Sequence, residues 1–372
     1  MHDTELLNVT WRSAVLMAIL FGIASVAMTH IGRAIEQQAS QLLGVFLLVF
    51  AWNLVPQVLG FSGFYRVYPD LTFAPFNTEL WLGPLLLHFT LVLLKQPRPK
   101  WHNTLYLPAV VQTLYYCAAF TLIPDYQQKW AYNDAFHIVY IRPLEVGLTI
   151  ALTAWCLQMS WRSISAYRVE LSEVQSNVED FDSRWLTRFI VAMLIMFVTW
   201  TGMELVHQFN ELSYVSQYPF YLLLSLIVLW MGLQALSSIR YPFPVPLKQE
   251  ASLPKENQAT LKNLANDIEA QVWSRQWFLQ PRFSITDMAR ELATNESYIS
   301  RAINQHLETN FNGLINAARV QHCQQLLREN PQRSLVELVF ESGFNSKASF
   351  NRNFKEYTGQ SPSVFVASLS PE

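Results

Sequence analysis

Cysteine is scarce in this chain of 372 residues, which has three, at widely separated positions. Cys117 and Cys156 lie in apolar runs, and Cys323 lies in a predicted helix. No spacing among them matches a disulfide framework or a zinc site. We therefore expect neither a structural disulfide nor a bound metal.

The motifs of the common enzyme classes are missing as well. The chain contains no HExxH, no G-x-S-x-G and no phosphate-binding glycine loop, because its twelve glycines are dispersed. The apolar segments hold no pair of carboxylates at helical spacing. We expect no catalytic residue and no cofactor, so an integral membrane enzyme is the weakest hypothesis for this chain.

Charge is sparse and unevenly distributed. Only 15% of the residues are charged whereas 51% are hydrophobic, and the mean hydropathy is +0.15. Residues 1–240 contain long uncharged runs, and residues 248–372 have the composition of a soluble domain. This change predicts a membrane domain over 1–239, a linker over 240–261 and a soluble domain over 262–372.

Seven apolar segments approach the roughly 20 residues that a helix needs to cross a bilayer. We therefore predict an all-α N-terminal bundle of seven transmembrane helices. The segments are 12–31, 41–60, 76–94, 104–123, 138–160, 186–206 and 217–238.

The distribution of Lys and Arg predicts the orientation of these segments. One set of alternate loops is richer in basic residues than the other and is expected to be cytoplasmic. The N-terminus is then outside, and the C-terminal domain is inside a bacterial inner membrane. Cleavage of residues 1–27 as a signal peptide would reverse this topology, but the acidic, arginine-poor start argues against it. The richer loops hold Arg33, Lys95, Arg98, Lys100, Arg162, Arg168, Arg184, Arg240 and Lys248.

Several polar residues fall within the predicted spans. Ionisable groups in a membrane are costly and often functional, so His88, Arg142 and Glu145 are candidates for sensing a ligand or a proton. The alternative is a hydrogen bond between helices, worth about 0.6–2 kcal/mol. For Asn53, Gln57 and Gln112 we favour that structural role.

The predicted linker carries prolines at alternate positions, in the sequence IRYPFPVP. Such a pattern favours an extended, fairly stiff segment without internal hydrogen bonds. We expect it to hold the C-terminal domain away from the membrane surface.

The C-terminal region repeats one pattern twice. An S-x-x-[DE] helix start opens each copy, at Ser284 and at Ser334, and apolar residues follow at helical spacing. A short turn then leads into a second helix, ESYISRAIN in the first copy and KASFNRNFK in the second. This pattern predicts two helix-turn-helix units, joined by an amphipathic helix that ends before Pro331.

Residues 262–368 resemble the DNA-binding domain of the AraC/XylS family of bacterial transcription regulators. The resemblance rests on Gly343-Phe344, on Phe350-x-Arg352-x-Phe354-Lys355 and on Thr358-Gly359-x-Ser361-Pro362. It implies a domain of seven helices, in which the third and the sixth read DNA.

The two reading helices implied by the resemblance begin near Asn295 and Ser346. Arg can bind guanine through two hydrogen bonds, Asn suits adenine and Glu can accept from cytosine, whereas Lys355 suits a phosphate. Arg301 and Arg352 are the strongest candidates among these residues. The predicted DNA-binding residues are Glu296, Ser297, Ser300, Arg301, Lys347, Ser349, Asn351, Arg352 and Lys355.

Two positions depart from the family's pattern, and one of them is Cys323, a small packed residue where the linking helix usually has Ala. Glu308 stands where the family usually has Gly after the first reading helix, so this helix is expected to end differently. From Lys262 onward the chain has eleven basic and eleven acidic residues, although DNA-binding domains are usually basic. A single domain is therefore expected to bind weakly, and a homodimer would raise the effective concentration at paired sites.

These observations favour a membrane-embedded transcriptional regulator that acts without a separate sensor protein. Its expected partners are double-stranded promoter DNA, membrane lipid, RNA polymerase if it is an activator, and an unknown chemical or physical signal. The alternative is a membrane receptor or transporter whose cytoplasmic domain contacts proteins and no longer binds DNA. That alternative predicts no sequence-selective DNA binding.

Overall fold

The structure is a computed structural model, and it describes residues 10–178, 184–209, 214–239, 258–330 and 332–369. In these ranges the regular elements are helices, and the one β-type pairing is an isolated bridge between Gln175 and Ser284. The expected all-α fold is thus confirmed. Most of the predicted linker, residues 240–257, lies outside the described residues.

The chain divides into two compact units. Unit 1 comprises Met1–Ile164 and Ser183–Phe243, and unit 2 comprises Ser165–Asp182 and Pro244–Glu372. Unit 2 thus includes a stretch from the middle of the chain, and no sequence pattern connects this stretch with the C-terminal domain. This stretch begins within helix α7.

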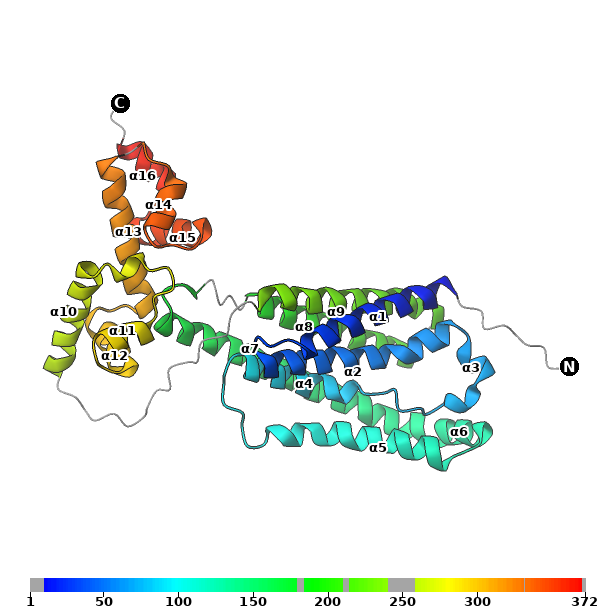
Figure 1. Ribbon diagram of the computed structural model, residues 1–372. Coiled ribbons are helices and arrows are strands. Elements are labelled where there is room, and N and C mark those ends of the chain that lie inside the picture. The colour runs from blue at the N-terminus through cyan, green and yellow to red at the C-terminus, as the bar shows by residue number, and fades with distance from the viewer. Residues whose placement is uncertain (1–9, 179–183, 210–213, 240–257, 331, 370–372) are drawn as a thin grey trace. The chain divides into compact units, whose positions relative to one another are not determined.

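Unit 1 is built from nine α-helices with short 3-10 and π segments between them, counting described residues only (Figure 1). The helices are α1 (Trp11–Ile31), α2 (Gln37–Phe61), α3 (Phe64–Val67), α4 (Glu79–Leu93), α5 (Leu107–Leu122), α6 (Tyr126–Tyr132), α7 (Arg142–Val174), α8 (Arg184–Phe209) and α9 (Tyr218–Ser238). The π-helix η3 (Asn133–Ile141) joins α6 to α7.

Six helical stretches of the described chain are long and apolar enough to cross a membrane. They correspond to six of the seven predicted spans. The third predicted span, 76–94, forms the shorter helix α4 of 15 residues, because the residues before Glu79 adopt turns. Length and composition therefore give six candidate membrane helices and one shorter apolar helix.

Small residues set the packing of α1 against α2 and α9. A Cβ atom at Gly44 of α2 would lie 2.7 Å from the carbonyl oxygen of Ala27 in α1. A Cβ atom at Gly232 of α9 would lie 2.9 Å from a methyl carbon of Val26. Glycine lets helix backbones approach closely, as is common in membrane proteins.

Large apolar side chains remain exposed on the outer helices of unit 1. Phe21 on α1 is 63% exposed, as is Leu114 on α5, and Val198 on α8 and Leu223 on α9 are each 60% exposed. Soluble proteins usually bury such large apolar side chains. Such helices suit an apolar environment like the bilayer core.

In the described part of unit 2, seven α-helices follow residue 257 (Figure 1). They match the number implied by the resemblance, and the third and sixth are α12 and α15. The helices are α10 (Gln258–Ser274), α11 (Ile285–Glu291), α12 (Glu296–His306), α13 (Phe311–Glu329), α14 (Leu335–Glu341), α15 (Lys347–Thr358) and α16 (Pro362–Leu369).

Local capping fixes where the helices of each helix-turn-helix unit begin. Ser284 and Asp287 form a capping box at the start of α11. Ser334 precedes α14, but its side chain makes no capping hydrogen bond. Asn295 accepts from the N–H of Tyr298 at the start of α12, and Ser346 accepts from the N–H of Ser349 at the start of α15.

Two apolar cores hold unit 2 together, one for each helix-turn-helix unit. The first contains Ile299 and Ile303 of α12, and the second contains Phe350 and Phe354 of α15. Helix α13 contributes its first half to one core and its second half to the other. Val174, the last residue of α7, is buried in the first core.

Candidate functional site

Helix α15 presents a polar, basic face. Lys347, Asn351, Arg352 and Lys355 are exposed on it, and they follow one another at helical spacing. The opposite face of the helix is buried, so these side chains point out of the domain. Three basic groups and one amide on one helix face can donate hydrogen bonds to phosphates and to base edges.

Ser349 differs from the other predicted residues of this helix. It is only 6% exposed, and its backbone N–H donates to Ser346 Oγ at 3.1 Å. Asn353 Nδ2 lies 3.3 Å from its hydroxyl oxygen and 2.9 Å from its carbonyl oxygen. The structure therefore places Ser349 on the edge of the buried face, where it secures the first turn of α15.

Helix α12 holds the corresponding residues of the first copy. Glu296, Ser297, Ser300 and Arg301 are all half-buried, whereas Asn304, one turn further, is exposed. In the register that aligns Arg301 with Arg352, Ser300 corresponds to Asn351 and Asn304 to Lys355. The two predicted reading faces thus use the same positions but differ in accessibility.

A carboxylate from the middle of the chain contacts this face of α12. One oxygen, Oε2 of Glu173, accepts hydrogen bonds from Ser300 Oγ at 3.0 Å and from Asn304 Nδ2 at 2.9 Å. Glu173 lies near the end of α7, in the stretch that belongs to unit 2. We call residues 165–178 the α7 arm.

Further hydrogen bonds fasten the α7 arm to the first helix-turn-helix unit. Asn310 Nδ2 donates to Ser172 Oγ at 3.2 Å, and Asn312 Nδ2 donates to the carbonyl oxygen of Gln175 at 3.1 Å. The N–H of Ser176 donates to the carbonyl oxygen of Phe283 at 3.3 Å. With Val174 in the apolar core, the arm is an integral part of this unit.

Arg319 in the middle of α13 anchors the same segment. It is 1% exposed and donates to the carbonyl oxygens of Phe278 at 2.7 Å, Gln280 at 2.9 Å and Ser176 at 3.3 Å. Burial lowers the pKa of this guanidinium to about 10, so it is still charged at neutral pH. Its buried charge is satisfied by backbone carbonyls from two separate parts of the chain.

The turns of the two copies have the same backbone shape but different residues. Ala293 (φ 50°) and Glu308 (φ 52°) adopt the left-handed conformation in the first copy, where the second copy has Gly343 (φ 84°) and Gly359 (φ 76°). Helix α12 therefore ends much as α15 does, in spite of Glu308. A residue with a side chain is strained in this conformation, whereas glycine is not.

The balanced charge of residues 262–372 conceals an uneven distribution. Several arginines are used within the domain: Arg275 pairs with Glu291 at 2.7 Å, Arg333 with Glu341 at 2.6 Å, and Arg319 is buried. The face of α15 by contrast carries three exposed basic residues. A DNA-binding surface of local positive charge is thus compatible with a net charge near zero.

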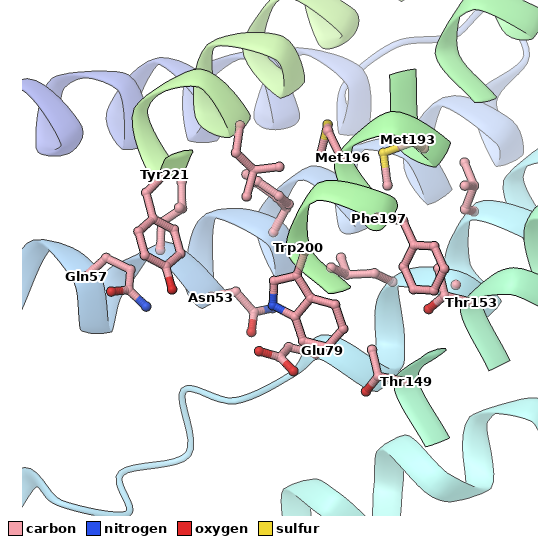
Figure 2. Close-up of a pocket in the computed structure, with 16 residues that line it drawn as sticks. Asn53, Gln57, Glu79, Thr149, Thr153, Met193, Met196, Phe197, Trp200 and Tyr221 are labelled. Atoms are coloured by element: carbon pink, nitrogen blue, oxygen red, sulfur yellow. The ribbon is translucent and has the colours of Figure 1, made fainter. Parts of the chain in front are cut away.

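A second candidate site lies inside unit 1. Arg142 of α7 forms ion pairs with Glu204 of α8 at 2.7 Å and with Glu79 of α4 at 3.6 Å. These three residues line a cavity of about 950 Å³. An adjacent pocket of about 130 Å³ shares Gln57, Glu79, Trp200 and Tyr221 with it, and Figure 2 shows these four side chains around the pocket.

The structure does not bring the three predicted sensing residues together into one cluster. Arg142 pairs with the two glutamates. The carboxylate of Glu145 is buried and accepts from Tyr116 Oη at 3.1 Å and from Gln112 Nε2 at 3.3 Å. His88 contacts Tyr106 Oη at 3.1 Å and Arg98 Nη1 at 2.9 Å. The hydrogen bond from Gln112 links α5 to α7.

Two partners of Arg142 were not predicted as site residues. Glu79 and Glu204 both lie within predicted spans, and pairing every ionisable group in those spans could have found them. For Glu173 the sequence offers no such signal, because it lies in a polar stretch between two predicted spans. Within the described residues, no group of three or more His, Cys, Asp or Glu could hold a metal ion.

Comparison with known proteins concerns unit 2 alone. Residues 288–368 match the family model described as a helix-turn-helix domain. The chain is 27% identical over 111 residues to the Msm operon regulatory protein of Streptococcus mutans, which covers 30% of this chain and 38% of that protein. It is also 27% identical over 82 residues to an uncharacterized HTH-type transcriptional regulator of Staphylococcus aureus (strain COL), covering 22% of this chain and 11% of that protein.

These matches cover well under two thirds of either relative, and no solved structure matches the chain. The C-terminal region is an AraC-type helix-turn-helix domain, as the resemblance implied, and it is preceded by apolar helices.

Proposed function

We propose that this chain, which carries an AraC-type helix-turn-helix domain, is a transcriptional regulator embedded in a membrane through unit 1. The observation that supports DNA binding most directly is the exposed face of α15, with Lys347, Asn351, Arg352 and Lys355. This helix is the second helix of a helix-turn-helix unit, the element that enters the major groove. Arg352 and Asn351 would contact bases, and Lys347 and Lys355 would contact phosphates.

The grouping of the α7 arm with the C-terminal domain supports the proposed topology. The arm lies in the loop between the fifth and sixth predicted spans, and two further apolar helices, α8 and α9, separate it from the C-terminal domain in the sequence. Two crossings return a chain to the same side of a membrane. The arm and the domain can thus both lie in the cytoplasm, as the basic residues of the loops predict.

The same proposal assigns sensing to the cavity around Arg142. A small charged solute could replace one carboxylate as the partner of Arg142 and so favour one arrangement of α4, α7 and α8 over another. The cavity offers charged groups of both signs beside Trp200 and Tyr221, which suits a solute with a polar head. Neither His88 nor Glu145 lines the two cavities, so Arg142 is the main candidate among the three.

DNA binding is tested by crosslinking the protein to the chromosome in intact cells and sequencing the bound DNA. We expect discrete sites for the native protein and their loss in the Arg301→Ala, Arg352→Ala double variant. Lys262→Ala, which removes an exposed charge from α10, is the matched control and should retain the sites. If the well-expressed native protein enriches no site under several growth conditions, the receptor or transporter hypothesis becomes the better one.

Sensing is tested by the response of the crosslinked genes to growth conditions. Arg142→Gln should leave the sites occupied while their transcription no longer changes with conditions. Arg66→Gln on α3, which changes an exposed arginine outside both cavities, is the control. A normal response in Arg142→Gln would reject the cavity as the sensing site without affecting the proposal of DNA binding.

A further inference from the structure

The α7 arm contacts the first reading helix at the positions that DNA would need. Ser300 and Asn304 both donate to the same oxygen of Glu173, at 3.0 and 2.9 Å. Their counterparts in α15 are Asn351 and Lys355, which are exposed. A hydroxyl or amide hydrogen that is donated to Glu173 cannot at the same time be donated to a base or a phosphate.

The charge of Glu173 opposes DNA as well. Double-stranded DNA carries a negative charge about every 1.7 Å along its axis, so a carboxylate on a reading face repels it. Hydrogen bonds to a carboxylate are also stronger than those between neutral groups. Release of the reading face therefore requires the loss of two charge-assisted hydrogen bonds.

The remainder of the arm is held in a different way. Val174 is buried in the first core, and Ser176 accepts a hydrogen bond from Arg319 and donates its own N–H to the carbonyl oxygen of Phe283. These contacts are not on the reading face of α12, and they can persist when Glu173 moves. The contact of Glu173 with α12 is thus separable from the attachment of the arm.

We propose that Glu173 is an autoinhibitory residue, which occupies the first reading helix and leaves DNA binding to α15 until the contact is broken. This inference rests on the proposed function, because it concerns the regulation of the same DNA-binding surface. Glu173 and Arg142 belong to one helix, α7. A solute that binds in the cavity of unit 1 can therefore act through α7 on the contact between Glu173 and the first reading helix, α12.

The inference predicts a difference in the length of DNA that the protein covers. With α12 occupied, the native protein should protect mainly the groove segment read by α15. With α12 released, it should also protect the next major-groove segment, about one helical turn or 10 base pairs away. The affinity should rise because a larger fraction of the molecules is competent for two-groove binding.

The experiment compares the native full-length chain with Glu173→Ala and Glu173→Gln, each reconstituted in lipid nanodiscs. Hydroxyl-radical footprints and dissociation constants are measured on a DNA site identified by crosslinking. Glu173→Ala should lengthen the footprint by about one turn and raise the affinity roughly tenfold. Glu173→Gln keeps a hydrogen-bond acceptor without the charge. Its footprint length and its affinity should therefore lie between those of Glu173→Ala and those of the native protein.

Glu170→Ala is the matched control, because it removes a glutamate one turn earlier on α7 and should change neither measurement. Arg301→Ala in the Glu173→Ala background should shorten the footprint again, which shows that α12 made the added contacts. Equal footprints and affinities for the native, Glu173→Ala and Glu173→Gln proteins would reject autoinhibition while DNA binding stands. Failure of all variants to bind any DNA site selectively would reject both proposals.

Discussion

The two helix-turn-helix units of this protein have the same arrangement of helices and turns but differ in the charge and exposure of the helix predicted to read DNA. Helix α15 exposes three basic residues on its outer face, whereas α12 carries one arginine and one glutamate there and is contacted by Glu173. The second unit has glycine at both left-handed positions, and the first has Ala293 and Glu308. The second unit thus has the exposed basic face that the proposed DNA binding requires, whereas the corresponding face of the first unit contacts the α7 arm.

The largest effect should come from the turn of the second unit. A Cβ atom at Gly343 would lie 2.2 Å from the carbonyl oxygen of Phe278, in addition to the unfavourable φ of 84°. We expect Gly343→Ala to lower the free energy of unfolding of unit 2 by about 3 kcal/mol or more. Thermal unfolding of the full-length protein measures the loss.

Gly359→Ala is the matched control for this change. Gly359 has a similar φ of 76°, but no atom lies within 4 Å of the position of an added Cβ. It should lower stability by only about 1 kcal/mol. Equal losses for the two variants would show that the clash with Phe278 is absent in solution.

The next largest effect concerns the two arginines. Arg352→Ala removes an exposed arginine of α15 and should weaken DNA binding by about 2 kcal/mol, roughly thirtyfold. Arg301→Ala should weaken it only a few-fold in the native background, since α12 is occupied. Titration of a DNA site identified by crosslinking with each protein gives both affinities. Similar losses of affinity for the two variants would contradict the prediction that α15 contributes more to DNA binding than α12.

Relief of strain in the first unit should have a smaller effect. Glu308→Gly introduces the residue that the second unit has at the equivalent turn, and we expect about 1 kcal/mol of stabilisation. Ala293→Gly should act in the same direction. Denaturant unfolding provides the measurement, and destabilisation by Glu308→Gly would mean that its side chain contributes more than the strain removes.

The smallest effect is a dependence on pH through His322 of α13. Burial lowers the pKa of this imidazole, whose ring lies 5.3 Å from that of Phe278. The unfolded chain therefore takes up the proton first as the pH falls through about 6.5, and stability decreases below that pH. Because the side chain is only partly buried, the loss between pH 7 and 5 should be below about 1 kcal/mol.

His322→Gln should remove the loss of stability that His322 causes between pH 7 and 5, and leave any loss that other groups cause. Unfolding curves of the two proteins between pH 7 and 5 make the comparison. If the free energy of unfolding changes with pH equally in both proteins, groups other than His322 cause the pH dependence.

Much of unit 2 could be predicted because its pattern is local. The capping box of Ser284 with Asp287 fixes the start of α11, and the apolar residues that follow Ser284 at helical spacing, among them Ile285 and Met288, are buried. Ser349 shows the limit of that reasoning. Ser349 was predicted to contact DNA because it is a polar residue of a predicted reading helix. Its position on α15, however, puts it beside the buried Asn353.

Contacts between distant parts of the chain were not predictable in this way. Arg142 was recognised as unusual in an apolar helix, but its partners Glu79 and Glu204 are 63 and 62 positions away. Glu173 is 127 positions from Ser300. One sequence does not show which distant polar groups meet, since any of several glutamates would satisfy the same arginine. The α7 arm was therefore expected as a loop and is part of the DNA-binding unit.

The buried guanidinium of Arg319 has a consequence for how this protein is made. Its hydrogen-bond acceptors come from Ser176, Phe278 and Gln280, so the first helix-turn-helix unit contains two stretches of chain with α8 and α9 between them. During synthesis the ribosome completes the arm long before α13 exists. Val174 of the arm therefore stays exposed until the last third of the chain, which completes the first core, has been synthesised. Chimeras that attach this DNA-binding domain to another sensor would need to carry the arm along with it.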